Sequence, residues 1–133
     1  MDTTKKNILI IEDDMALRKV LRDRLVDDNF TVLEAADGEE GLAQALANHP
    51  DLILLDIFMP KMDGVSMLAK LRSVDAWGKH VSVIVLTNST DAHTIAAVTG
   101  FGSTDFLIKS EWGLEAIVTR IRERLATPLA AAA

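Results

Sequence analysis

The feature that most constrains the fold of this chain is a series of short, β-branched apolar runs that recur along it. The five runs are Ile8–Ile11, Thr31–Leu33, Leu52–Leu55, Val81–Leu86 and Phe106–Ile108. Three of them are almost wholly apolar and do not alternate with polar residues. Strands that are buried on both faces have this composition, which is typical of parallel sheets covered by helices on each side. The runs therefore predict a buried, parallel, five-stranded sheet.

The segments between these runs have the spacing of amphipathic helices. Apolar residues recur at intervals of three and four positions, which places them on one helical face. The predicted helices centre on Leu17–Leu25, Leu42–Leu46, Val65–Leu71, a weaker Asp91–Thr99, and Leu114–Leu125. Asp37, Asp63 and Asp91 stand where N-caps are expected. Strands and helices thus alternate as (βα)5, which predicts an α/β, doubly wound three-layer sandwich with right-handed crossovers.

Composition limits the classes of function that this chain can have. Its 133 residues fit one domain, and 14 Lys and Arg against 20 Asp and Glu give a charge of −6. That charge disfavours direct binding to nucleic acid or to an anionic membrane. The absence of Cys excludes disulfides and thiol catalysis and fits a reducing compartment. We expect a cytoplasmic domain at residues 1–125, followed by a flexible tail, linker or cloning remnant at residues 126–133.

Polar residues follow four of the five predicted strands. Glu12-Asp13-Asp14 follows the first strand, Asp56 the third, Thr87 the fourth and Lys109 the fifth. The second strand ends in Ala35-Ala36 and offers no such group. A sheet order of 2-1-3-4-5 explains the exception, because the second strand is then an edge. Open α/β sheets bind ligands at the carboxyl ends of their strands, so Glu12, Asp13 and Asp56 should converge in one crevice.

This set of side chains suits phosphoryl transfer. Three ionised carboxylates at one point repel each other unless a cation neutralises them. Hard oxygen ligands favour Mg²⁺, with Mn²⁺ as a possible substitute. Lys109 would add a positive charge and Thr87 a hydroxyl donor for a group with several anionic oxygens. Asp56 is the candidate nucleophile, because it ends a central strand without an acidic neighbour.

The motifs resemble those of the receiver domain of two-component response regulators, over roughly residues 7–125. The matching segments are Glu12-Asp13-Asp14, Asp56-Ile57-Phe58-Met59-Pro60-Lys61-Met62-Asp63-Gly64, Thr87 and Lys109. Each segment alone would be weak, but all four stand in order at strand ends. The resemblance implies a flavodoxin-like fold similar to single-domain chemotaxis regulators. It also implies a phosphoacceptor that transfers a phosphoryl group to itself and later loses it, rather than a general enzyme.

The resemblance also implies a role for each matching residue. Asp56 would accept the phosphoryl group, with Asp13 as a direct Mg²⁺ ligand and Glu12 acting through water. The backbone carbonyl of Phe58 would supply a further oxygen.

Three more residues correspond to the switch positions of the family. Thr87 and Lys109 would contact the phosphoryl group, and Phe106 would rotate inward as Thr87 moves. Phosphorylation would favour an active conformer of the face made by the fourth helix, the fifth strand and the fifth helix. The donor would be a sensor histidine kinase or phosphotransfer protein, and the output a downstream protein target, with a homodimer through the same face as a further option.

The sequence departs from the family pattern in ways that affect the site. The family usually has Pro after the Lys, in a cis peptide, whereas Ser110 follows Lys109 here. A cis bond without Pro costs about 3–4 kcal/mol, so we expect a trans peptide or a strained cis one. Phe58 and Ser89 flank the path of an attacking water in this family. We expect the bulky Phe58 to slow hydrolysis of the acyl phosphate.

Other functions fit these residues less well. A receiver fold that signals or dimerises without phosphate is the main alternative, because Ser110 leaves it open. A haloacid-dehalogenase-type phosphatase also uses an Asp nucleophile, but it requires a second Asp where this chain has Phe58. A flavin-binding protein is disfavoured, since no Ser-, Thr- or Gly-rich phosphate loop follows the first strand.

Overall fold

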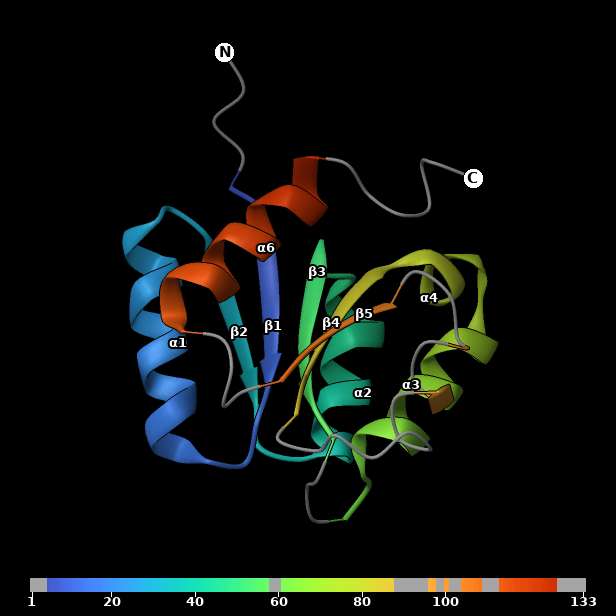
Figure 1. Cartoon of the computed structure of the whole chain (residues 1–133). Coiled ribbons are helices and arrows are strands. Elements are labelled where there is room, and N and C mark those ends of the chain that lie inside the picture. The colour runs from blue at the N-terminus through green and yellow to red at the C-terminus, as the bar shows by residue number, and fades with distance from the viewer. Residues whose placement is uncertain are drawn as a thin grey trace.

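The computed structural model contains the predicted parallel sheet. It describes residues 5–57, 61–87, 96–97, 100, 104–108 and 113–126. Five parallel strands lie in the order β2-β1-β3-β4-β5 (Figure 1), which confirms the predicted order. The strands are β1 (Asn7–Ile11), β2 (Thr31–Ala35), β3 (Leu52–Asp56), β4 (Ser82–Thr87) and β5 (Thr104–Ile108).

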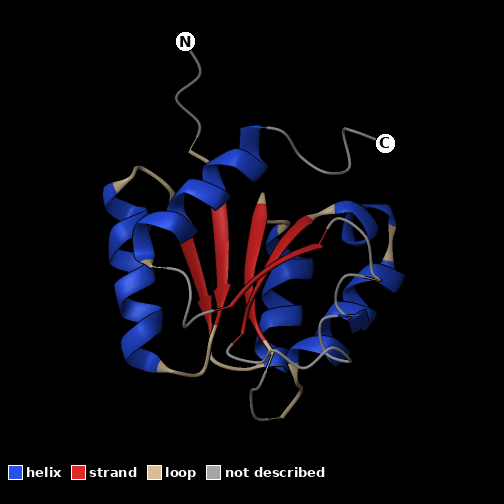
Figure 2. Cartoon of the chain, viewed as in Figure 1, coloured by secondary structure: helices blue, strands red, loops and turns tan. Residues whose placement is uncertain are grey.

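Helices cover both faces of the sheet, so the molecule has three layers (Figure 2). The described helices are α1 (Met15–Asp27), α2 (Gly38–Asn48), α3 (Gly64–Val74), α4 (Ala76–His80) and α6 (Leu114–Ala126). Residues of α1 and α6 pack in one core cluster, and residues of α2 and α3 pack in the other. The predicted three-layer sandwich is therefore confirmed. None of these helices is long and apolar enough to cross a membrane.

Alternate residues of the central strands supply the two core clusters. In β3, Ile53 and Leu55 face the α2 and α3 side, while Leu52 and Leu54 face the α1 and α6 side. All four side chains are at most 1% exposed. Burial on both faces is the reason that these strands are apolar without alternation.

Aspartates cap the helices that begin at the carboxyl edge of the sheet. Asp37 accepts a hydrogen bond from the N–H of Glu40, and Asp63 accepts one from Ser66, as predicted. Asp14 caps α1 through the N–H groups of Ala16 and Leu17. The predicted cap Asp91 lies outside the described residues. So does the predicted helix at residues 91–99, apart from residues 96–97, which are helical.

The short helix α4 was not predicted from the sequence. Asp75 caps it by accepting a hydrogen bond from the N–H of Gly78. The buried guanidinium of Arg72 donates to the carbonyl oxygens of Gly78 and Val81, at 2.9 and 2.7 Å. Burial lowers the pKa of Arg72 to about 10, which leaves the group charged at neutral pH. Arg72 thus fixes the connection between α3 and β4.

Candidate functional site

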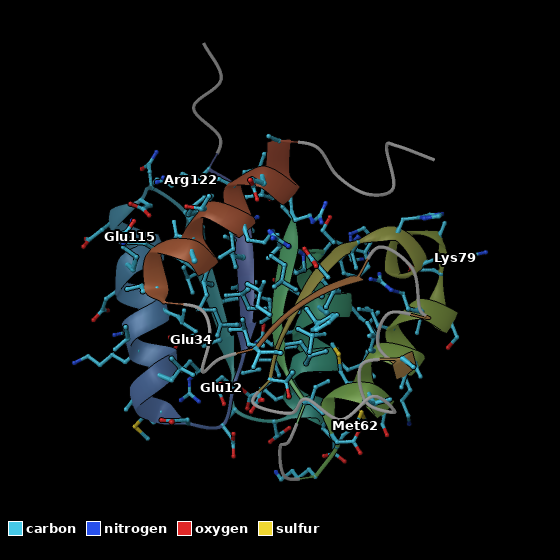
Figure 3. The ribbon with its side chains drawn as sticks, in the orientation of Figure 1. Glu12, Glu34, Met62, Lys79, Glu115 and Arg122 are labelled. Carbon is cyan, nitrogen blue, oxygen red and sulfur yellow. The ribbon has the colours of Figure 1, made fainter. Side chains whose placement is uncertain are left out.

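Three carboxylates meet at the carboxyl edge of the sheet. Glu12, Asp13 and Asp56 each place a carboxylate oxygen within 4.8 Å of the others. Glu12 and Asp56 are 2% and 7% exposed, whereas Asp13 faces solvent. The predicted convergence is confirmed, and it follows from the register, because Ile11 pairs with Leu55 at the ends of β1 and β3. Figure 3 shows Glu12 at this edge, where β1 ends.

The backbone of Glu12 is held from two sides. Its N–H donates to the carbonyl of Ala35 in β2, at 3.0 Å. Its carbonyl accepts a hydrogen bond of 2.6 Å from Nη1 of Arg18, whose Nε pairs with Glu34 at 3.1 Å. Arg18 therefore ties the end of β1 to α1 and β2. Sequence reasoning missed this residue, because a lone Arg in a helix carries no signal of such a contact.

The end of β3 is shaped by the turn that leads into α3. The N–H of Gly64 donates to the carbonyl of Ile57, at 2.7 Å. A Cβ built on Gly64 would lie 2.4 Å from the carbonyl oxygen of Asp56, closer than any side chain allows. Glycine is thus required at position 64 if Asp56 is to stay where the carboxylates converge.

The remaining predicted site residues fall partly within the described chain. Thr87 ends β4, beside β3, and is 2% exposed. Phe106 in β5 is partly buried against the core cluster on the α2 and α3 side. Lys109, Phe58 and Ser89 lie outside the described residues, and so does Ser110 with the peptide bond that precedes it.

The carboxylate cluster fits a divalent cation such as Mg²⁺. All three donors are oxygens, the ligand type that Mg²⁺ prefers. Two of the three carboxylates are buried, and buried like charges are costly unless a cation compensates them. The exposed Asp13 leaves one side of the cluster open to solvent, where waters and the oxygens of a phosphoryl group could complete a coordination shell.

A second group of charged residues joins β5 to α6. Asp105 accepts hydrogen bonds from Arg120 and from Arg124 of α6, the latter at 2.9 Å. Burial alone would raise the pKa of Asp105, but the two guanidinium groups outweigh it and hold that pKa below its usual range. Asp105 in turn raises the pKa of Arg120. These ion pairs fasten α6 to β5.

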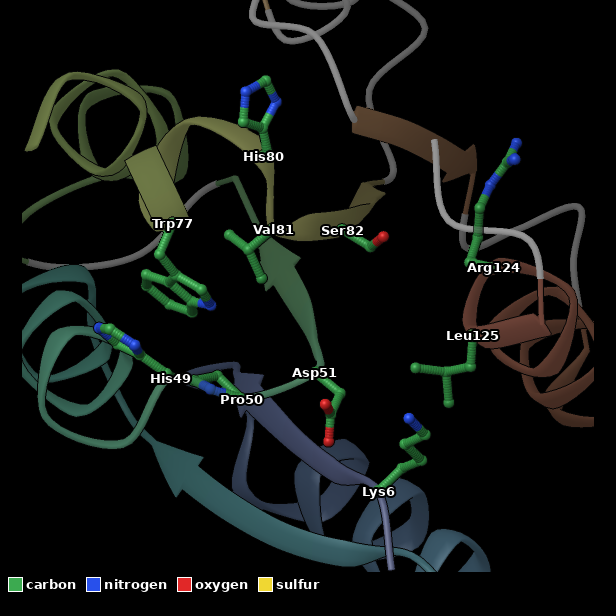
Figure 4. A pocket seen from close by; sticks show the side chains of 10 residues that line it. All are labelled: Lys6, His49, Pro50, Asp51, Trp77, His80, Val81, Ser82, Arg124 and Leu125. Carbon is green, nitrogen blue, oxygen red and sulfur yellow. The ribbon is translucent and has the colours of Figure 1, made fainter. Parts of the chain in front are cut away.

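The opposite, amino edge of the sheet has a pocket of about 210 Å³. Figure 4 shows Trp77 and Leu125 on opposite sides of it. The ring of His49 stacks on Trp77, with centroids 4.0 Å apart and planes 7° from parallel. Trp77 is half-buried and His49 is exposed, and the stacking of their rings was not predicted from the sequence. Asp51 in this pocket accepts a hydrogen bond from the N–H of Asn7, at 2.7 Å.

Comparison with known families identifies the chain. Residues 8–122 match the response regulator receiver domain, so the chain belongs to this family of two-component signalling domains. A relative is the response regulator ArlR of Staphylococcus aureus, 31% identical over 115 residues, which are 86% of this chain and 50% of that protein. The chain spans about half the length of the curated relatives that it matches.

Solved structures of similar proteins agree with this assignment. The chemotaxis response regulator CheY4 of Vibrio cholerae superposes with a TM-score of 0.81 and 27% identity, over 90% of this chain and 98% of that one. The CheX-CheY-BeF3-Mg complex of Borrelia burgdorferi gives a TM-score of 0.79 and 26% identity, over 89% of this chain and 87% of the matched one. The predicted flavodoxin-like receiver fold is confirmed.

Proposed function

We propose that this chain is a phosphorylation-dependent switch in which Asp56 accepts a phosphoryl group from a phosphohistidine donor. The observation that carries the proposal is the convergence of Glu12, Asp13 and Asp56, with oxygens within 4.8 Å, at the carboxyl edge of a receiver fold. An oxygen of Asp56 attacks phosphorus as the bond from phosphorus to the imidazole nitrogen breaks. The product is an acyl phosphate, and the imidazole nitrogen takes up a proton.

Neighbouring residues would prepare Asp56 for this attack. Asp13 would hold Mg²⁺ directly, Glu12 through water, and Phe58 through its backbone carbonyl, and Mn²⁺ could occupy the same oxygen ligands. The cation supplies charge neutralisation for the oxygens of the transferring group. Arg18 keeps Glu12 in place through its 2.6 Å hydrogen bond, which reduces the cost of ordering the site when the cation binds.

The output would be a change in the face that comprises residues 91–99, β5 and α6, which we call the output face. Thr87 and Lys109 would contact the phosphoryl oxygens, and Phe106 would turn inward as Thr87 moves. Phosphorylation then stabilises a conformer that exists at low population before it. Phe58 and Ser89 would set the lifetime of the acyl phosphate by controlling the approach of water.

The partners follow from the same role. The donor would be a sensor histidine kinase or a phosphotransfer protein in the cytoplasm, and the output face would bind a downstream protein or a second copy of the chain. The Borrelia complex brings together CheX, CheY, BeF3 and Mg, which supports a similar combination of partner protein and cation for this chain.

The direct test is the intact mass of the chain after incubation with acetyl phosphate and Mg²⁺. We expect one added phosphoryl group, and none in the Asp56→Asn variant or without a divalent cation. Rapid hydrolysis could hide the adduct, so beryllofluoride binding is measured in parallel. If neither the adduct nor beryllofluoride binding is seen, the chain is a receiver fold that acts without phosphate.

A further inference from the structure

The first turn of α2 lies against the loop that connects β3 to α3. Gly38, the first residue of α2, is buried. A Cβ built on Gly38 would lie 2.1 Å from the carbonyl oxygen of Met62 and 2.8 Å from its carbonyl carbon. These are backbone atoms, which cannot yield as the end of a flexible side chain can. The two segments therefore touch backbone to backbone, and only glycine permits this contact.

Asp37 adds an ionic contact between the same two segments. One of its carboxylate oxygens accepts the capping hydrogen bond from Glu40, at 2.8 Å. Its other oxygen lies 3.7 Å from Nζ of Lys61, in the loop. One buried carboxylate thus caps the start of α2 and contacts the loop at the same time. We call Asp37, Gly38, Lys61 and Met62 the clamp.

Further contacts of Lys61 and Met62, together with Gly64, restrain the loop. Met62 packs against the core cluster on the α2 and α3 side. The N–H of Gly64 closes the base of the loop on the carbonyl of Ile57. Lys61 has a φ of 66°, a left-handed conformation that a Lys rarely adopts without support from its surroundings. These contacts couple the position of Met62 to Gly64 and to Ile57, the residue that follows Asp56.

We propose that the clamp positions the β3–α3 loop for Mg²⁺, with Gly38 as its main positioning residue; this rests on the function proposed above. The loop leaves β3 directly after Asp56, one of the three clustered carboxylates, and its last contact is Gly64, which packs against the carbonyl of Asp56. Mg²⁺ demands ligands at roughly 2.0–2.1 Å in near-ideal octahedral geometry, whereas Ca²⁺ accepts roughly 2.3–2.6 Å and irregular shells. A displaced loop therefore weakens Mg²⁺ binding more than Ca²⁺ binding.

The test compares Gly38→Ala with the wild-type chain in NMR titrations with MgCl₂ and with CaCl₂. Gly113→Ala is the matched control, because a Cβ at Gly113 meets nothing within 4 Å. We expect Gly38→Ala to raise the Kd for Mg²⁺ about tenfold, the size of effect found for residues that orient ligands from outside the first shell. The Kd for Ca²⁺ should rise less than about threefold. The control should leave both values unchanged.

The outcomes separate the clamp from the metal site itself. If the wild-type chain binds neither cation, the proposed metal site is wrong and the clamp is wrong with it. If the wild-type chain binds Mg²⁺ but Gly38→Ala leaves the ratio of the two Kd values unchanged, the clamp alone is wrong. A general loss of stability lowers both affinities together and does not change that ratio.

Asp37→Asn provides a second test that does not depend on whether Gly38→Ala folds. Asparagine keeps an oxygen that can cap α2 but removes the charge that faces Lys61. Both cations carry the same charge, so the loss of a nearby negative charge affects the two Kd values equally and cancels in their ratio. We expect the preference for Mg²⁺ over Ca²⁺ to fall about twofold. An unchanged ratio in the folded variant contradicts the clamp.

Discussion

The two edges of the sheet place their charged groups in opposite ways. At the carboxyl edge, Glu12 and Asp56 are almost fully buried beside a third carboxylate. At the amino edge, Asp51 and His49 are exposed, and the aromatic stack with Trp77 lies around an open pocket. Both edges are rich in polar residues, so polarity alone does not separate a site from ordinary surface.

The two edges differ in how their charged groups affect the free energy of unfolding. Asp51 hydrogen-bonds the N–H of Asn7 and stabilises the start of β1. At the carboxyl edge, two of three neighbouring carboxylates are buried, and like charges placed together are costly unless a positive group such as a bound cation compensates them. The pairing of burial with like charge therefore distinguishes the carboxyl edge, where we propose the site.

Divalent cations give the first and largest test of this comparison. Mg²⁺ at about one hundred times its Kd should raise the free energy of unfolding by about 2.7 kcal/mol, because it binds only the folded chain. Thermal unfolding with and without Mg²⁺ measures the effect. Asp13→Asn should remove most of it, whereas Asp51→Asn should preserve it. Equal loss in both variants would mean that the cation does not bind at the carboxyl edge.

The same substitution should change stability in opposite directions at the two edges. Without divalent cations, Asp56→Asn relieves repulsion and should raise the free energy of unfolding by about 1 kcal/mol. Asp51→Asn weakens the hydrogen bond from Asn7 and should lower it by about 0.5 kcal/mol. Urea unfolding of both variants in EDTA measures these changes. Destabilisation by Asp56→Asn would show that its carboxylate is structural.

The smallest expected effect concerns Asp105, which belongs to neither edge. Its pKa is lower in the folded chain than in the unfolded chain, because Arg120 and Arg124 outweigh its burial. The stability that it contributes is therefore complete above its unfolded pKa of about 3.9, and is lost as the pH falls through the folded value. Asp105→Asn should flatten the acid limb of a plot of stability against pH. An unchanged slope below about pH 4 would contradict this ion-pair arrangement.

Much of the fold and part of the site could be predicted from local sequence. Runs such as Leu52–Leu55 reveal both-face burial, and the residues that follow them reveal the carboxylate cluster. The prediction missed α4, because five residues carry too little periodicity and their helix depends on hydrogen bonds from Arg72. It also missed Arg18 and Gly38, whose contacts join segments distant in sequence. The roles of Phe58, Ser89, Thr87, Phe106 and Lys109 stay predictions.

The most direct test of the central claim is an NMR titration of amide shifts, first with Mg²⁺ and then with beryllofluoride. We expect the amides of Glu12, Asp13 and Asp56 to shift with Mg²⁺, and those of β5 and α6 to follow with beryllofluoride. The amides of His49 and Asp51 at the amino edge should stay in place, and Asp56→Asn should abolish the beryllofluoride step. Shifts confined to the amino edge, or a beryllofluoride response that survives in Asp56→Asn, would contradict the account.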